Sequence, residues 1–251
     1  MTWLFDTHIH LSDSDYSEDI EIILNQMKFL QIKSCCVSMN YENSIETFNL
    51  SKKSNLILPF LGIHPEFATE NISNCVELIR KNHNEIIGIG EIGLDPTYCK
   101  NDTDYPTQKN VFETFLSIAE KYEKPVSIHS RKSLDDIFDV MSSFSTKHAL
   151  LHWFDGSKKQ LQKAMDLGFY VSFGPVSVYA DDKKSLISKT NLSQILVETD
   201  GPVRFSRCFE MKSGQITFIP SVIFNISKVL KMTYDDMVKI LEKNSNAYLG
   251  I

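Results

Sequence analysis

The chain has 251 residues, of which 42% are hydrophobic and 23% charged, and its formal net charge is −6. This length and composition are typical of a globular protein with a substantial core and argue against a disordered chain. An acidic chain offers no broad lysine and arginine surface for sequence-independent binding of nucleic acid, so any recognition of phosphate is expected to be local.

The cysteines and the N-terminus bear on the compartment. The five cysteines are an odd number and form no C-x-x-C pair, which argues against a disulfide framework and against a thiolate zinc site. The N-terminus has no basic segment followed by a long apolar run, and no stretch approaches the length of a membrane span. We therefore expect a soluble, cytoplasmic protein with no membrane partner.

Short apolar or β-branched runs alternate with segments of helical spacing along the chain. The runs predict eight strands, at residues 3–9, 34–39, 56–63, 85–92, 125–128, 148–153, 169–173 and 194–199. Helical spacing is present, for example, at residues 20–30 and 111–119. Residues 201–218 predict a loop, and residues 220–231 and 234–248 predict two helices that complete an outer ring.

This alternation predicts a parallel sheet, because parallel strands need crossover helices between them. Eight units without a linker fit a closed barrel better than an open doubly wound sheet. No internal repeat, low-complexity segment or shift in composition marks a second domain. The expected fold class is α/β, with a single (β/α)8 TIM barrel that occupies residues 1–251.

The first predicted strand ends with two histidines, His8 and His10. Side chains two positions apart on a strand share a face, so both imidazoles can point toward one ion. Imidazole suits zinc and other borderline metals. An H-x-H motif is short enough to arise by chance, and the alternative is a pair of ordinary polar residues at a strand end.

Four more candidate ligands occupy equivalent positions, each at the end of a predicted strand: Glu91, His129, His152 and Asp200. In a (β/α)8 barrel all these strand ends open on one face, where the active sites of such enzymes lie. The agreement between separate strands favours the metal interpretation over the polar-residue alternative.

Four imidazoles and two carboxylates are too many for one tetrahedral ion but suit two divalent ions that share a carboxylate. We assign His8, His10 and Asp200 to one ion. His129 and His152 are assigned to the other ion, and Glu91 bridges the two. Two ions roughly 3.5–4 Å apart polarise a phosphoryl or carbonyl oxygen and lower the pKa of a bound water, so we expect hydrolysis. Asp200 is also the candidate general base.

These residues resemble the TatD family of metal-dependent deoxyribonucleases, within the wider group of amidohydrolase-like barrels. The resemblance covers the whole chain and is carried in order by residues 5–10 (FDTHIH), 62–65 (GIHP), 90–95 (GEIGLD), 125–131 (PVSIHSR), 152–156 (HWFDG) and 198–202 (ETDGP). Gln108 is similar to a glutamine that precedes a helix in the family, and residues 246–249 (NAYL) are similar to its closing pattern.

The resemblance implies a TIM barrel, a cofactor of divalent ions (Zn, Mg or Mn) and hydrolysis of phosphodiester bonds, with the family's six ligands carried onto the residues above. It also implies that His64 lies in the pocket near the substrate phosphate, to contact it or to deliver a proton. The alternative is that His64 only bonds the loop backbone. Three positions depart from the family pattern and are expected to flank the pocket: Glu66, Trp153 and Gly201.

Arg131 is a candidate substrate-binding residue, because guanidinium can bind two phosphate oxygens at once. A surface ion pair is the alternative. Arg204 and Arg207 lie in the loop after the last strand, where barrel enzymes often bind phosphate, but solvated side chains are the favoured interpretation. Trp153 and Phe154 either stack on a base, as aromatic residues do in single-strand binding, or pack within the barrel.

The leading hypothesis is a metal-dependent deoxyribonuclease that acts on single strands or DNA ends, because the pocket of a closed barrel admits a thread more easily than a duplex. The alternative is a metal-dependent hydrolase of another ester, amide or aminoacyl bond, since the same ions polarise carbonyls and the fold supports many chemistries. A third hypothesis, a non-catalytic scaffold, predicts loss of ligands, whereas all six candidate ligands are present.

Overall fold

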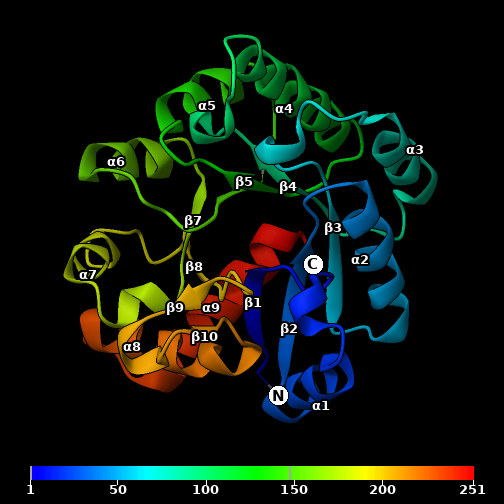
Figure 1. Ribbon diagram of the computed structural model, residues 1–251. Helices are drawn as coiled ribbons and strands as arrows, with labels where there is room; N and C mark the ends of the chain where they lie inside the picture. The colour runs from blue at the N-terminus through cyan, green and yellow to red at the C-terminus, as the bar shows by residue number, and fades with distance from the viewer. Residues whose placement is uncertain (1, 147) are drawn as a thin grey trace.

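The computed structural model describes residues 2–146 and 148–251. Eight parallel strands follow one another around a barrel in chain order, and helices cover its outside (Figure 1). The predicted TIM barrel is confirmed.

Each strand overlaps the run that predicted it. The strands are β1 (Leu4–Ile9), β2 (Ile32–Val37), β3 (Ile57–Leu61), β4 (Gly88–Gly93), β5 (Val126–His129), β6 (Ala149–Leu151), β7 (Tyr170–Phe173) and β8 (Ile195–Val197). All residues of β3 and β4 are buried, as expected for a parallel sheet that side chains fill on one face and helices cover on the other.

The helices form the outer ring: α1 (Ile20–Leu30), α2 (Tyr41–Lys53), α3 (Ser73–Asn82), α4 (Asp104–Lys121), α5 (Leu134–Met141), α6 (Lys158–Asp166), α7 (Asp181–Ile187), α8 (Ile219–Val229) and α9 (Tyr234–Leu249). Helix α4 shows why they form, because it buries Val111, Phe112 and Phe115 at helical spacing. Helix α6 begins with a capping box in which Ser157 and Gln160 bond each other's backbone N–H groups.

Helix α9 lies behind the barrel when the molecule is viewed into its mouth (Figure 1). Its Tyr248 is fully buried, stacks on Phe60 of β3 with 6.1 Å between ring centroids, and donates its hydroxyl to the Val126 carbonyl of β5 at 3.1 Å. This packing closes the far end of the barrel, so that ligands enter from the end at which the strands terminate.

The seam between β1 and β8 is joined by residues at the strand ends and by side chains. The Thr7 hydroxyl donates to the Val197 carbonyl at 2.9 Å, and the Thr199 amide donates to Asp6 Oδ1 at 2.9 Å. The Asp200 amide then donates to the His8 carbonyl, also at 2.9 Å. These bonds fix the register of β1 against β8 and thereby place Asp200 beside His8.

The segment 201–218 is more ordered than the predicted loop. It contains a small antiparallel hairpin, formed by β9 (Arg204–Phe205) and β10 (Lys212–Ser213). Strands of two residues are too short to show an alternating pattern, which is why the sequence did not reveal them. The hairpin buries Phe205, which is 2% exposed, next to the mouth of the barrel.

None of the helices in the described part of the chain is by itself long and apolar enough to cross a membrane. Residues 216–229 and 234–249 meet the length and composition criteria only as a pair bent by 109°. Both segments pack on the barrel, where Ile223 and Ile226 of α8 and Leu241 of α9 are buried.

Candidate metal centre

The six candidate ligands and His64 meet at the mouth of the barrel. They come from the C-terminal ends of β1, β3, β4, β5, β6 and β8 or from the residues that follow them. All except the partly exposed His129 are buried: His8, His10, His64, Glu91, His152 and Asp200. The structure thus brings together every predicted ligand, while their roles as ligands stay a prediction.

The first cluster contains the two histidines of the H-x-H motif. His8 Nε2 and His10 Nε2 lie 3.3 Å apart, and they lie 3.5 Å and 3.3 Å from Glu91 Oε2. Asp200 Oδ1 completes the cluster at 3.5 Å from His8 Nε2 and 3.6 Å from His10 Nε2.

The second cluster gathers around the other oxygen of the same glutamate. Glu91 Oε1 lies 2.8 Å from His152 Nε2 and 2.9 Å from His129 Nδ1, and these two ring nitrogens are 3.4 Å apart. Glu91 therefore presents one oxygen to each cluster, which is the arrangement expected of a bridging carboxylate.

The spacing of these atoms fits metal ions. Ligand atoms about 2.0–2.1 Å from a tetrahedral ion are separated from one another by about 3.3–3.4 Å, and most distances in the first cluster are close to this value. Buried clusters of histidine and glutamate side chains can hold metal ions here. Three such groups can be formed from neighbouring ligand atoms: His8, His10 and Glu91; His64, Glu91 and His129; and His8, His152 and Glu198. The sequence-based grouping of the ligands stays a prediction.

The charge balance of the centre also favours a cation. Burial raises the pKa of Glu91, but the neighbouring imidazoles of His152, His64 and His8 outweigh it and hold the pKa well below its usual range. Burial lowers the pKa of His8 to about 4, so this imidazole is neutral at pH 7 and has a lone pair to offer. Burial also lowers the pKa of His152, but the Glu91 carboxylate outweighs it and raises the pKa to about 9.

Neighbouring polar groups orient the ligands. Asp95 Oδ2 lies 2.9 Å from His129 Nε2, and Ser127 Oγ lies 2.8 Å from His8 Nδ1. Such partners fix the tautomer and the direction of a ligating imidazole. Ser127 was missed, although it lies two positions before His129 on β5 and so shares its face.

Gln108 fastens the loop that carries Asp95. Its Oε1 accepts from the Asp95 amide at 2.9 Å, and its Nε2 donates to the carbonyls of Asp95 at 2.9 Å and Pro65 at 3.3 Å. The expectation that Gln108 precedes a helix is wrong, because it lies inside α4. From there a long amide side chain can reach the loops after both β3 and β4.

Glu198 is a buried carboxylate beneath the centre. It accepts from the Trp153 amide at 2.7 Å and from the Ser172 hydroxyl at 2.5 Å, and its Oε2 lies 4.0 Å from His152 Nδ1. Burial raises the pKa of this carboxyl to about 8. Glu198 thus ties the loop after β6 to β7 and β8.

His64 bonds the loop backbone and faces the centre at the same time. Its Nδ1 accepts from the Glu66 amide at 3.2 Å, while its Nε2 lies 3.3 Å from His129 Nδ1 and 3.8 Å from Glu91 Oε1. Burial lowers its pKa to about 3, so the ring is neutral. A neutral ring that accepts at Nδ1 carries its proton on Nε2, so in this tautomer His64 can donate toward the centre. His64 also belongs to a group, with Glu91 and His129, that could hold a metal ion.

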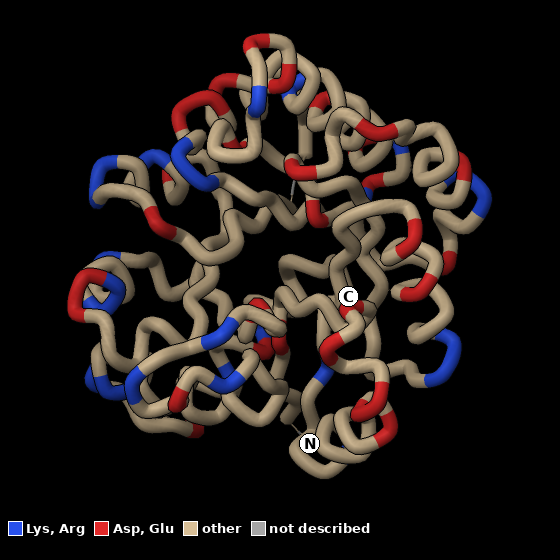
Figure 2. The backbone as a smooth tube through the Cα atoms, viewed as in Figure 1, with Lys and Arg blue, Asp and Glu red and all other residues tan. Residues whose placement is uncertain are grey.

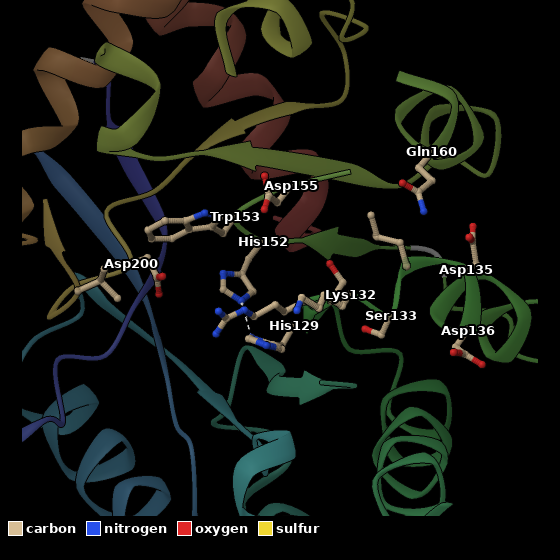
Figure 3. Close-up of a pocket in the computed structure, with 14 residues that line it drawn as sticks. His129, Lys132, Ser133, Asp135, Asp136, His152, Trp153, Asp155, Gln160 and Asp200 are labelled. Atoms are coloured by element: carbon tan, nitrogen blue, oxygen red, sulfur yellow. Dashed lines mark hydrogen bonds between the residues drawn. The ribbon is translucent and has the colours of Figure 1, made fainter. Parts of the chain in front are cut away.

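A cleft of about 820 Å³ leads outward from the centre. It is lined by His129, Ser130, Arg131, Lys132, Ser133, Leu134, Asp135, Asp136, His152, Trp153, Asp155, Gln160, Asp200 and Val203 (Figure 3). Around it, lysine and arginine alternate with acidic residues over the outer helices and loops (Figure 2). The only arginine in this lining is Arg131, so the local recognition of phosphate expected from the sequence has one guanidinium available here.

The other sequence-predicted positions lie farther from the cleft. Arg204 is exposed and forms an ion pair of 3.8 Å with Asp15, and Arg207 is also exposed. Of the three residues expected to flank the pocket, Trp153 lines the cleft, Glu66 is exposed and Gly201 is buried directly after the lining residue Asp200. For Glu66 and Gly201 this expectation stays a prediction.

The absence of a side chain at residue 201 has a steric reason. A Cβ atom at this position would collide with the hydroxyl of Tyr16 and the carbonyl of Gly214, which are themselves hydrogen-bonded to each other. A serine does not fit there without movement of the hairpin. The departure at residue 201 follows from this packing.

Comparison with known proteins places this geometry in a family. The sequence profile described as TatD related DNase matches residues 5–250. The uncharacterized metal-dependent hydrolase YabD of Bacillus subtilis is 25% identical over 99% of both chains. The human deoxyribonuclease TATDN3 is 25% identical over 79% of this chain and 78% of its own. The crystal structure of YJJV, a TatD homolog from Escherichia coli, superposes with a TM-score of 0.90 at 22% identity and covers 99% of this chain and 98% of its own.

Proposed function

The chain belongs to the family of TatD-related DNases and is a metal-dependent hydrolase, and from this premise we propose that it is a divalent-metal-dependent deoxyribonuclease. In this proposal two ions share Glu91, and the bond that breaks is a phosphodiester bond in single strands or at DNA ends. The observation that carries the proposal is the pair of clusters around the two oxygens of one buried glutamate.

When bound, the two ions supply Lewis acidity for a phosphoryl oxygen and lower the pKa of the attacking water. The first ion would be held by His8, His10 and Asp200, the second by His129 and His152, with Glu91 between them.

The remaining steps belong to side chains of the cleft and of the centre. The Asp200 carboxylate, on the floor of the cleft, accepts the proton of the attacking water, and the oxygen of that water forms the new bond to phosphorus. His64 carries a proton on Nε2 that donates a hydrogen bond to a phosphate oxygen, and the leaving 3′ or 5′ oxygen takes up the proton that Asp200 accepted as its bond to phosphorus breaks. Arg131, exposed on the wall, binds another phosphate oxygen.

Two observations support DNA as the substrate. The family is described by its DNases, and a relative of similar length is described as a deoxyribonuclease. The cleft reaches His152 and Asp200 of the buried centre, in a barrel whose far end is closed, which suits a single strand or an end better than a continuous duplex. We place the activity in the cytoplasm, in keeping with five cysteines that are all free thiols.

The test is cleavage of end-labelled single-stranded DNA by purified protein loaded with Zn²⁺, Mg²⁺ or Mn²⁺. We expect cleavage that EDTA abolishes, that any effective metal restores and that Glu91→Ala does not support. Intact DNA with every metal would refute the nuclease proposal. Ester, lactone, cyclic amide and aminoacyl-RNA substrates run in parallel would then identify a hydrolase of another bond.

A further inference from the structure

We propose that the indole of Trp153 is a stacking platform for a nucleobase of the substrate strand. The proposal rests on the proposed function and deepens it, because it names the part of a polynucleotide that the rim of the cleft binds.

Trp153 occupies the rim directly beside the centre. It follows His152 in the chain and lines the cleft beside Asp200 (Figure 3). Val203 belongs to the same lining. Val203 is 40% exposed, so this part of the rim is open and apolar. The adjacent Phe154 is 1% exposed and belongs to the core. Of the two aromatic residues that the sequence offered, only Trp153 faces the substrate.

A second aromatic ring supports the indole from behind. Phe205 of β9 stacks on Trp153 with 5.6 Å between ring centroids and 19° between ring planes. Phe205 is itself buried and contacts Phe209, whose ring packs against Phe218 at 4.5 Å. One face of the indole is thus covered by a fixed aromatic stack, and the cleft side is left for a ligand.

The backbone of Trp153 is held in a conformation that bulky residues rarely adopt. Its φ is 42°, in the left-handed region, and its amide donates to the buried Glu198 carboxylate at 2.7 Å. Strain of this kind persists only where surrounding contacts impose it, and it is concentrated at functional sites. Here the contact with Glu198 keeps the indole at the mouth of the cleft.

The chemistry of this rim selects a base rather than a phosphate. The indole and Val203 are uncharged, whereas Arg131 and Lys132 line the cleft from the loop after β5. A nucleotide whose phosphate lies at the centre can place its base on Trp153, because this residue lines the same cleft as His152 and Asp200. Every base has a π face, so the platform tolerates any sequence but requires a base that is not already stacked in a duplex.

Intrinsic fluorescence tests the platform without relying on catalysis. The chain has two tryptophans, and Trp3 precedes β1 at the opposite end of that strand from the centre. A Trp3→Phe variant makes Trp153 the sole reporter. We expect dAMP to quench its emission saturably and deoxyribose 5-phosphate to leave it unchanged. Emission of the matched Trp153→Phe variant should respond to neither ligand.

Kinetics provide the second test. With a single-stranded oligodeoxynucleotide, Trp153→Ala should raise KM roughly 5- to 150-fold, the range for loss of one stacked base. Because stacking contributes equally to ground and transition states, kcat should not change. Trp153→Phe should retain most of the affinity. A strand with tetrahydrofuran in place of its nucleosides should bind wild type and Trp153→Ala alike.

The outcomes separate this inference from the proposed function. Quenching by dAMP in a protein that cleaves no DNA would refute the nuclease proposal and leave a base-binding platform. DNA cleavage with an unchanged KM in Trp153→Ala, together with equal responses to dAMP and deoxyribose 5-phosphate, would overturn the platform.

Discussion

The floor of the cleft consists of the six candidate ligands, and its rim consists of Arg131, Lys132, Trp153 and Val203. Both come from the strand ends and the loops that follow them, but they are built in different ways. On the floor, buried side chains are held by neighbours, as His8 is by Ser127 and His129 by Asp95. On the rim, Arg131 and Lys132 extend into solvent, and Trp153 is partly exposed.

This difference in construction separates the part of the cleft that would carry out the reaction from the part that would select the substrate. A metal site needs ligand atoms fixed to within a few tenths of an ångström, which only a buried and hydrogen-bonded floor provides. Binding of a substrate along the rim tolerates looser contacts, because side chains there can adjust. In this chain the aromatic residue that reaches the cleft, Trp153, lies on the rim.

The largest expected effect comes from removing the residue that both clusters share. Glu91→Gln keeps the size of the side chain but removes the charge that bridges the clusters. We expect hydrolysis to fall on the order of 10³-fold or more, because charge stabilisation by the ions is worth several kcal/mol. Metal content measured by atomic spectroscopy should fall with it. The exposed Glu66→Gln is the matched control, and an equal loss there would break the distinction between floor and rim.

The next prediction concerns the side chains that hydrogen-bond to the candidate ligands on the floor. Asp95→Asn and Ser127→Ala leave all six candidate ligands in place but weaken the partners of His129 and His8. We expect metal affinity to fall about 10- to 100-fold in each. Titration with a competing chelator would measure it. Affinity equal to that of wild type in both variants would show that the floor does not depend on these supports.

Gly201 lies where the floor meets the hairpin of the rim. Gly201→Ala places a methyl group against the Tyr16 hydroxyl and should lower the free energy of unfolding by about 1–3 kcal/mol. Urea denaturation would measure this loss. In a Tyr16→Phe background, which lacks that hydroxyl, the same substitution should cost less.

Gly174→Ala is the control for this packing, because its added methyl group meets Glu198 at an ordinary 3.5 Å. If Gly174→Ala and Gly201→Ala destabilise the protein equally, the collision with Tyr16 is not the cause.

The sequence predicted the floor much better than the rim, and the reason is physical. Ligands at strand ends follow from periodicity, since a (β/α)8 barrel brings all these ends to one face. His8, Glu91 and Asp200 could therefore be grouped before any coordinates were known. The register across the seam, which sets Asp200 against His8, depends on contacts between residues almost 200 positions apart, such as Thr7 and Val197 with a separation of 190.

The rim could not be derived in the same way. Phe205 supports Trp153 only because a hairpin with two-residue strands brings it there, and strands of that length leave no periodic signal. The small size of Gly201 is required by Tyr16, which is distant in sequence. Tertiary packing decides such positions, and local pattern does not record it.

The smallest expected effect is at Arg131, and it tests whether a rim residue contributes to substrate binding alone. Its guanidinium is exposed, so water and salt screen its attraction for phosphate, and Arg131→Ala should raise KM for single-stranded DNA only about two- to fivefold. The effect should vanish above about 0.5 M salt, where the Debye length falls below the distance between neighbouring charges. Arg131→Lys keeps the charge and should restore the salt dependence, but not the bidentate contact with phosphate.

Arg207→Ala, which changes an exposed arginine outside the cleft lining, is the control. A loss of kcat in Arg131→Ala instead of a rise in KM would assign this residue to the transition state, and the boundary between floor and rim would then have to include it.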